Sequence, residues 1–515
     1  MNVKRMEKIK RIVGAVLFIG IAISALLGAT YLFRGHVFGY NDRISVVGIK
    51  EEKKDSLDVI YIGGSAAFVY WEPMKAYKDC GFTSYDLATN SIQAESILAY
   101  IKYAQEYQNP DLYVIGVRAF QYYSEEGSES GLRLTSDSLD MGINKFNLIH
   151  EYLQNHTTEI DELSLYLDLV KYHTNYDALS NETAWHLIDN KEECDYKGNL
   201  IQSAWCYLEE PQDFRNDNRA TLLENDEKVL NELLDYLDDN NINALFVVCP
   251  YSITNEDYSK YNTIGDMVTS HGYNFLNAND YYYEMGVDFS TDFYNVAHMN
   301  GVGAEKYTDF LERYISDNYD LPDHRGDMEY ADWDEKATQF VDQSEACKEH
   351  VYKLISAADE GVNLGESIRA TDDFFAWSSY VKDYRYSLFI VGNGEALVTD
   401  SAIDKKYLEY LGIDLYELFG TNSYIKFISD EMHTSNITIP DVVDNSLTVQ
   451  AGQIMGKSSV TIDDKDNACS IIVEGTEYSR KDSDGINIVV FDNYYRTVID
   501  SVTLKKIGEN ISIVR

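Results

Sequence analysis

The chain has 515 residues, too many for one ordinary hydrophobic core, so its length predicts two folded units. It carries 86 Asp and Glu residues against 43 Lys and Arg, and this formal charge of -43 argues against a nucleic-acid partner. The six cysteines have neither C-x-x-C nor His-paired spacing, and no H-E-x-x-H motif occurs. We therefore predict no cofactor and no dedicated metal site, although an acidic surface can hold Ca²⁺ loosely.

The amino terminus predicts a membrane anchor. Residues 1–11 are basic, and the uncharged apolar run 12–33 that follows is long enough to span a bilayer. The basic flank places the amino end in the cytoplasm and the bulk of the chain outside the cell membrane. A cleaved signal peptide is the alternative, but the run exceeds a typical signal core and no clear A-x-A site follows.

After a polar tether at 34–56, short apolar runs alternate with helical patterns, which predicts an α/β domain with a parallel sheet over about 57–320. The expected strands are Val59 to Gly63, Thr83 to Ala88, Leu112 to Val117, Ala244 to Cys249 and Tyr273 to Leu276. The expected helices are Ala94 to Tyr107, Asn144 to Gln154, Leu163 to His173 and Asn225 to Leu237. The segment 121–218 interrupts this order and predicts a helical insertion over the carboxyl edge of the sheet.

Beyond residue 333 the pattern changes. A charged connector helix is expected over 334–360, clearest from Asp334 to Ala358, and a mostly β domain over 361–515. Its expected strands are Ser387 to Val391, Tyr424 to Ser429, Ser458 to Asp463, Ser470 to Glu474, Ile486 to Phe491 and Thr497 to Val502, with one helix near Lys405 to Leu411.

Two loops of the first domain carry candidate chemistry. In DVIYIGGSAAF, an apolar strand ends in two glycines and Ser65, at the sheet edge where open α/β folds bind ligands. In DFYNVAHMNGVGAEKYT, His298 lies in a loop before the last helix of the domain. A histidine there can reach a serine that follows the first strand, which suggests a nucleophile and its base. A glycine-rich strand exit and a solvated loop histidine are also common without any chemistry.

Together with YDLATNSIQ and PDLYVIGV, these motifs resemble the SGNH/GDSL hydrolase superfamily over residues 56–320. They look most similar to its membrane-anchored members that act in teichoic acid D-alanylation and polysaccharide O-acetylation. The resemblance implies a flavodoxin-like three-layer fold, Ser65 as nucleophile and His298 as general base. It also implies oxyanion donors at the Ser65 N–H and at the family's second and third blocks, which fall at Asn90 or Ser91 and near Arg118.

The chain departs from the family pattern at the acidic residue that normally precedes the histidine. The residue three before His298 is Asn295, which can orient an imidazole but cannot stabilise its charged form by charge. Asp292, slightly earlier, is the alternative orienter. Either a dyad operates, Asp292 serves, or catalysis has been lost. Arg118 can donate to an oxyanion or an anionic substrate, or can simply pair with a surface acid.

The carboxyl-terminal domain resembles the ILEI-type (interleukin-like EMT inducer) domain over about residues 361–515, on YSLFIVGNGEALVTD, YLEYLGID and SIIVEGTEYSRKDSDGINIVVFDNYYRTVIDSV. That resemblance implies binding, with a carbohydrate as the ligand class. A structural spacer is the alternative.

These patterns predict an extracytoplasmic, membrane-anchored serine esterase or O-acyltransferase. Its substrate would be a cell-surface polysaccharide or teichoic-type polymer, and its partner a membrane-bound O-acyltransferase. The competing hypothesis is a catalytically inactive SGNH-like binding or assembly protein of cell-envelope glycan biosynthesis.

Overall fold

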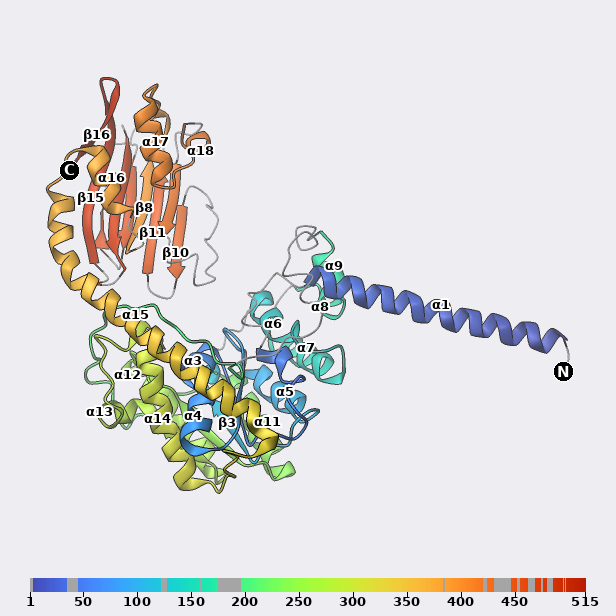
Figure 1. Ribbon diagram of the computed structural model, residues 1–515. Coiled ribbons are helices and arrows are strands. Elements are labelled where there is room, and N and C mark those ends of the chain that lie inside the picture. The colour runs from blue at the N-terminus through green and yellow to red at the C-terminus, as the bar shows by residue number, and fades with distance from the viewer. Residues whose placement is uncertain are drawn as a thin grey trace. The chain divides into compact units, whose positions relative to one another are not determined.

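The computed structural model, shown in Figure 1, describes most of the chain. The described residues are 3–34, 45–121, 127–157, 160–174, 196–382, 385–419, 424–429, 446–451, 454–461, 468–473, 476–478, 485–493, 495 and 497–515. Contacts divide the chain into two compact units, which are described separately. The first unit comprises Met1–Gln202, Pro211–Val287 and Gly303–Glu345, and the second comprises Ser203–Glu210, Asp288–Val302 and Ala346–Arg515.

The amino-terminal helix α1 runs from Val3 to Arg34. Its segment Ile9–Thr30 has a mean hydropathy of 2.5, and none of its most apolar part is buried in the protein. In a bilayer, where water is absent, a single segment can satisfy all of its own backbone hydrogen bonds only as a helix. The predicted apolar helix is therefore present, and it is long enough to cross a membrane.

The core of the first unit is a sheet of five parallel strands in the order β2-β1-β3-β4-β5. This order is typical of flavodoxin-like doubly wound sheets. The strands are β1 (Val59–Gly63), β2 (Ser84–Ala88), β3 (Leu112–Gly116), β4 (Ala244–Val248) and β5 (Asn274–Asn277). β1, β2 and β4 are buried at every residue. Burial on both faces explains why β1 and β4 read as continuous apolar runs, whereas β2 also buries Ser84 and Asp86. The α/β prediction is confirmed, with each strand within one residue of its expected ends.

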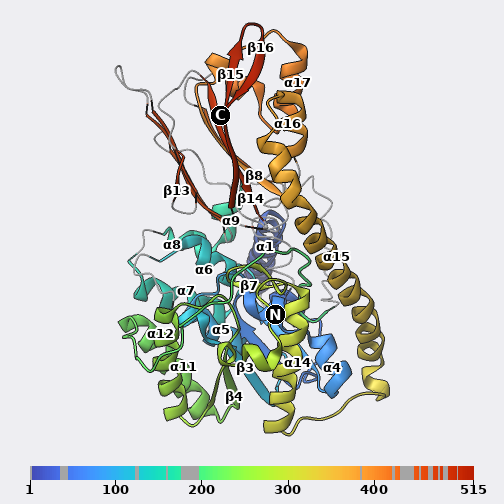
Figure 2. The same cartoon turned by 90° about the vertical axis from the view of Figure 1, so that its left-hand side faces the viewer.

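Helices cover both faces of this sheet (Figure 2). On one face, Thr308 of α14 accepts the Glu72 N–H and donates to the Tyr70 carbonyl, which fixes α14 beside α3 and α4. On the other face, Tyr236 of α11 donates to Gln105 at the end of α5. The helices are α3 (Ser65–Tyr70), α4 (Pro73–Cys80), α14 (Gly301–Asn318), α5 (Ala94–Ala104), α11 (Glu224–Asn240) and α12 (Asn255–Ser270).

The predicted insertion is helical in part, with α6 (Glu129–Ser136), α7 (Ile143–Asn155), α8 (Glu162–Tyr166) and α9 (Asp168–Tyr172). Its described end, residues 196–218, instead forms turns and irregular structure. The expected single helix Leu163 to His173 was wrong, because the backbone leaves helical geometry at Leu167 (φ -117°, ψ 80°). His156, at the end of α7, lies 3.0 Å from the buried Glu95 carboxylate of α5. This pair joins the insertion to the α/β core.

A 39-residue helix, α15 (Ala331–Arg369), includes the predicted connector and leads into the β-rich part of the second unit. There an antiparallel sheet has the order β16-β15-β14-β8-β9. Its strands are β8 (Tyr386–Gly392), β9 (Tyr424–Ser429), β14 (Ile486–Asp492), β15 (Thr497–Ile507) and β16 (Asn510–Val514). A second antiparallel sheet contains β10 (Ser446–Ala451), β11 (Ile454–Thr461), β12 (Ala468–Val473) and β13 (Thr476–Glu477).

The five-stranded sheet is buried on both faces. Alternate residues such as Leu388 and Ile488 pack with Trp377 of α16 (Phe374–Val381) and Leu408 of α17 (Ala402–Tyr410). The intervening residues, such as Phe389, pack with side chains of β12. Period-two alternation thus fills two separate hydrophobic layers, and the predicted mostly β character of this region is confirmed.

Candidate active site

Ser65 follows directly on strand β1 and opens helix α3. It is half-buried, whereas residues 66 to 70 of the same helix are buried. Gly64 makes the turn, and its carbonyl accepts the Ala67 N–H at 2.9 Å. The Ser65 N–H therefore lies in a first helical turn, where the helix itself supplies no acceptor. This is the carboxyl edge of the parallel sheet, as the sequence predicted.

The loop after β2 lies beside this turn. The Thr89 N–H donates to the Gly63 carbonyl, and a side chain at Gly64 would face the Thr89 carbonyl and Ile92. Ser91 has a positive φ of 48°, a conformation that glycine adopts more readily than serine. Of the two expected oxyanion positions in this loop, Asn90 and Ser91, Ser91 is the one with a glycine-like backbone. Both residues follow β2 at the carboxyl edge of the sheet, as Ser65 follows β1.

Arg118 lies in the short 3₁₀ helix Val117–Gln121 that follows strand β3. Its guanidinium stacks 4.2 Å from the centre of the Tyr251 ring, and the Tyr251 hydroxyl lies 3.2 Å from that of Tyr261. A guanidinium stacked on an aromatic ring directs its N–H donors in the plane of the group, parallel to the ring. Arg118 is thus held at the carboxyl edge by an aromatic platform.

Cys249 follows strand β4 at this edge and is a second potential nucleophile. Burial raises the pKa of its thiol, and its sulfur lies 3.1 Å from the Tyr61 hydroxyl. Because a buried neutral thiol is a poor nucleophile, Cys249 fits a structural role.

His298 lies on a small antiparallel hairpin of β6 (Phe293–Asn295) and β7 (His298–Met299), within the second unit. Its Nδ1 is 3.0 Å from Asn295 Oδ1, and its ring stacks on Tyr294 with centroids 5.5 Å apart. The Ala297 N–H also donates to Asn295 Oδ1, at 2.9 Å. Because a backbone N–H can only donate, the atom facing both groups is the amide oxygen, and His298 must carry its proton on Nδ1. Nε2 of the neutral ring is then the basic atom.

Asp292 has a different place. Its carboxylate accepts the Asp288 N–H at 2.7 Å and the Thr291 hydroxyl at 2.7 Å, so it shapes the turn before the hairpin. Asn300 closes the other end, donating to the Thr291 carbonyl and accepting the N–H of Val302 in α14. Of the two predicted orienters, Asn295 is the one hydrogen-bonded to the Nδ1 of His298.

The sequence pointed to Ser65, His298 and Asn295 as candidates but not to the two aromatic side chains, Tyr251 and Tyr294, that stack on Arg118 and His298. Tyr294 could have been suspected, since it lies one residue before Asn295 in the same motif. Tyr251 follows Pro250 after a different strand, and nothing in its local sequence connects it to Arg118. In the described chain, the one group of acidic side chains with metal-ligand spacing is Asp79 of α4 with Asp309 and Glu312 of α14.

Neither the models of known protein families nor the curated proteins contain a match to this chain.

Proposed function

We propose that this chain is a membrane-anchored extracytoplasmic serine esterase or O-acyltransferase of the SGNH type. Its substrate would be an acylated cell-surface polysaccharide or teichoic-type polymer. The observation that supports it most is the hydrogen bond from His298 Nδ1–H to Asn295 Oδ1, which leaves Nε2 as a base. The apolar helix α1 and its basic flank support an anchor with a cytoplasmic amino end.

In the proposed reaction, the Ser65 hydroxyl attacks the acyl carbonyl while His298 Nε2 takes its proton. The negative oxygen of the tetrahedral intermediate accepts hydrogen bonds from backbone N–H groups of Ser65 and Asn90, with Arg118 as a cationic donor. His298 returns the proton to the leaving sugar oxygen. Water then releases the acyl group in an esterase, whereas a sugar hydroxyl accepts it in an acyltransferase.

The second candidate is a binding or assembly protein of envelope glycan biosynthesis that keeps the fold without the reaction. Asn295 supports it, because a neutral amide cannot stabilise an imidazolium as a carboxylate does. The half-buried aromatic Tyr294 stacked on His298 would suit a sugar ring as well as a catalytic imidazole.

Serine-probe labelling separates the two candidates. The full-length chain in detergent is treated with a fluorophosphonate and assayed for p-nitrophenyl acetate hydrolysis. The enzyme hypothesis predicts labelling and turnover that Ser65→Ala abolishes and that the exposed control Ser270→Ala retains. Absence of both labelling and turnover in the wild-type chain would favour the binding protein.

A further inference from the structure

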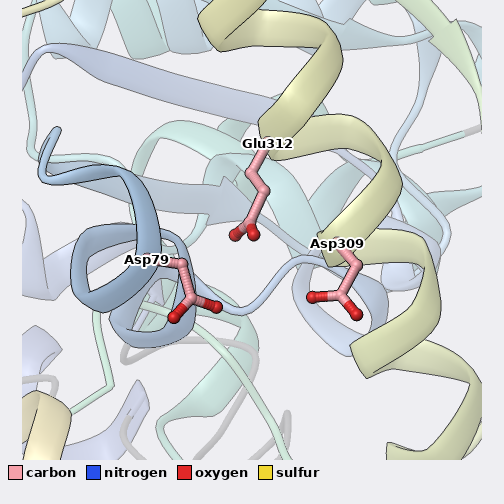
Figure 3. A group of neighbouring side chains, drawn as sticks. All are labelled: Asp79, Asp309 and Glu312. Carbon is pink, nitrogen blue, oxygen red and sulfur yellow. The ribbon is translucent and has the colours of Figure 1, made fainter.

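Three carboxylates from two helices converge on the sheet face covered by α4 and α14 (Figure 3). Asp79 lies in the last turn of α4, and Asp309 and Glu312 lie three residues apart on α14. One oxygen of each lies within 4.8 Å of the other two. Like charges at this spacing repel, and a carboxylate in the last turn of a helix also faces the negative end of its dipole. Both effects favour a cation at this place.

Glu312 is the member that most needs a partner. The residue exposes only 5% of its surface, and its Oε2 has no hydrogen-bond partner in the described chain. Figure 3 shows its carboxylate directed toward the space between Asp79 and Asp309. Buried carboxylates are normally paired, hydrogen-bonded or bound to metal, so this oxygen is in a position to coordinate a cation.

Lys75 supplies part of the missing positive charge. Its ammonium lies 2.5 Å from Asp79 Oδ2 and 2.6 Å from Asp309 Oδ1. Two neighbouring guanidinium groups donate to backbone carbonyls, Arg313 to that of Asp309 and Arg325 to that of Asp79. Arg325 also forms a salt bridge with the Asp323 carboxylate. When all three carboxylates are ionised, as in a cation complex, the one ammonium leaves a charge of about -2, which one divalent cation compensates.

We propose that Asp79, Asp309 and Glu312 bind a hard divalent cation, of the Ca²⁺ or Mg²⁺ class, in exchange for the Lys75 ammonium. A ligand set made only of carboxylate oxygens selects such ions rather than zinc or copper. Three carboxylates offer up to about six oxygens, and water completes the coordination.

The structure provides a place for the displaced lysine. Lys75 already lines a hollow of about 130 Å³ next to the cluster, and Glu305 and Glu345 line the same hollow. Swinging the ammonium toward these acids frees the cluster while keeping the lysine in a polar surrounding. The cation would join α4 to α14 where α4 ends, four residues before strand β2 enters the sheet, whereas Ser65 lies at the carboxyl edge. The role of the cation is therefore structural and independent of the proposed reaction.

The test uses the full-length chain in detergent, stripped with EDTA and titrated with CaCl₂ or MgCl₂ by calorimetry and thermal melting. At about ten times the dissociation constant, the melting temperature should rise by about 3 °C. Glu312→Gln should lose this rise, and Asp317→Asn, which removes an exposed acid from the same helix, should keep it. No rise in the wild type, or an equal rise in Glu312→Gln, would overturn the proposal.

A second variant keeps the test decisive if Glu312→Gln does not fold. Lys75→Met removes the competing ammonium and should tighten cation binding by about tenfold or more. Unchanged or weaker binding would show that Lys75 does not occupy the cation's place, and the proposal would fail. Serine-probe labelling of Ser65 should be the same with and without the cation, so failure here is distinguishable from failure of the proposed function.

Discussion

Replacing Asn295 by aspartate tests the proposed base most informatively. Asn295 Oδ1 accepts from both the His298 ring and the Ala297 N–H, and a carboxylate oxygen can accept from both in the same way. Asn295 is buried, exposing 7% of its surface, so the new charge would be only partly screened by water. The substitution therefore changes the charge at His298 with little change in geometry.

The size of the effect follows from the 3.0 Å separation between Asn295 Oδ1 and His298 Nδ1. Two unit charges at that distance interact by about 5 kcal/mol at an effective dielectric constant of about 20, or about 10⁴ in rate. The amide already contributes part of this through its dipole, and His298 is only half-buried. We therefore expect Asn295→Asp to raise kcat/KM by about 10- to 1,000-fold, with the pKa of His298 raised as well.

The assay is p-nitrophenyl acetate hydrolysis across a pH range, with the His298 titration followed by NMR. Rates are compared above the raised pKa, where the ring is neutral in both proteins. Asn295→Ala serves as the control and should lower the rate, because it removes the orienting oxygen. A rate unchanged in Asn295→Asp together with a raised His298 pKa would refute the reasoning. An inactive wild type with an active Asn295→Asp would identify a protein that has lost its reaction.

Three further predictions concern stability, measured by urea unfolding. Burial, and then a neighbouring carboxylate, raise the pKa of Asp226 to about 7. The free energy of unfolding is therefore unaffected by this residue below about pH 4, and it falls as the pH rises through about 7. Asp226→Asn should therefore stabilise the protein at alkaline pH, by up to about 4 kcal/mol, and leave it unchanged at about pH 4; an equal effect at both would contradict this. Gly198→Ala should lower the free energy of unfolding by about 3 kcal/mol or more, because the φ of Gly198 is +94° and a Cβ would collide with a backbone carbonyl. Gly272 has a similar φ of +88° but open space around it, so Gly272→Ala should lower the free energy of unfolding by only about 1 kcal/mol. Equal costs would refute the role of the collision. Arg385→Met should cost about 3–5 kcal/mol by stranding the buried Asp492 carboxylate, and adding Asp492→Leu should restore most of it; no recovery in the double variant would show that the pair is not the cause.

Strands β1, β3 and β4 could be predicted closely because each is a short apolar run that is buried along almost its whole length. Helix α16 was missed, since FFAWSSYV is short and aromatic and shows no clear helical period. Helix α15 continues through Gly361 and Gly365, where the composition suggested an end. Two glycines cost about 1 kcal/mol each in a helix, so tertiary packing or the rest of the long helix must outweigh their propensity.

The candidate site shows a similar division. The family resemblance offered Asn295 and Asp292 as alternative orienters of His298, and the structure has Asn295 bonded to its Nδ1. The tautomer of His298 depends on the Ala297 N–H, which no side-chain pattern reveals. The carboxylate cluster was also missed. Asp309 and Glu312 read as an ordinary solvated acidic face, and only the fold brings Asp79 to them and buries Glu312.

Peptide mapping of the fluorophosphonate adduct tests the central claim most directly. The account predicts one adduct in the wild-type chain, on Ser65, with its rate of formation greatly reduced in His298→Ala. An adduct on another residue, or labelling of Ser65 at an equal rate without the imidazole, would contradict it.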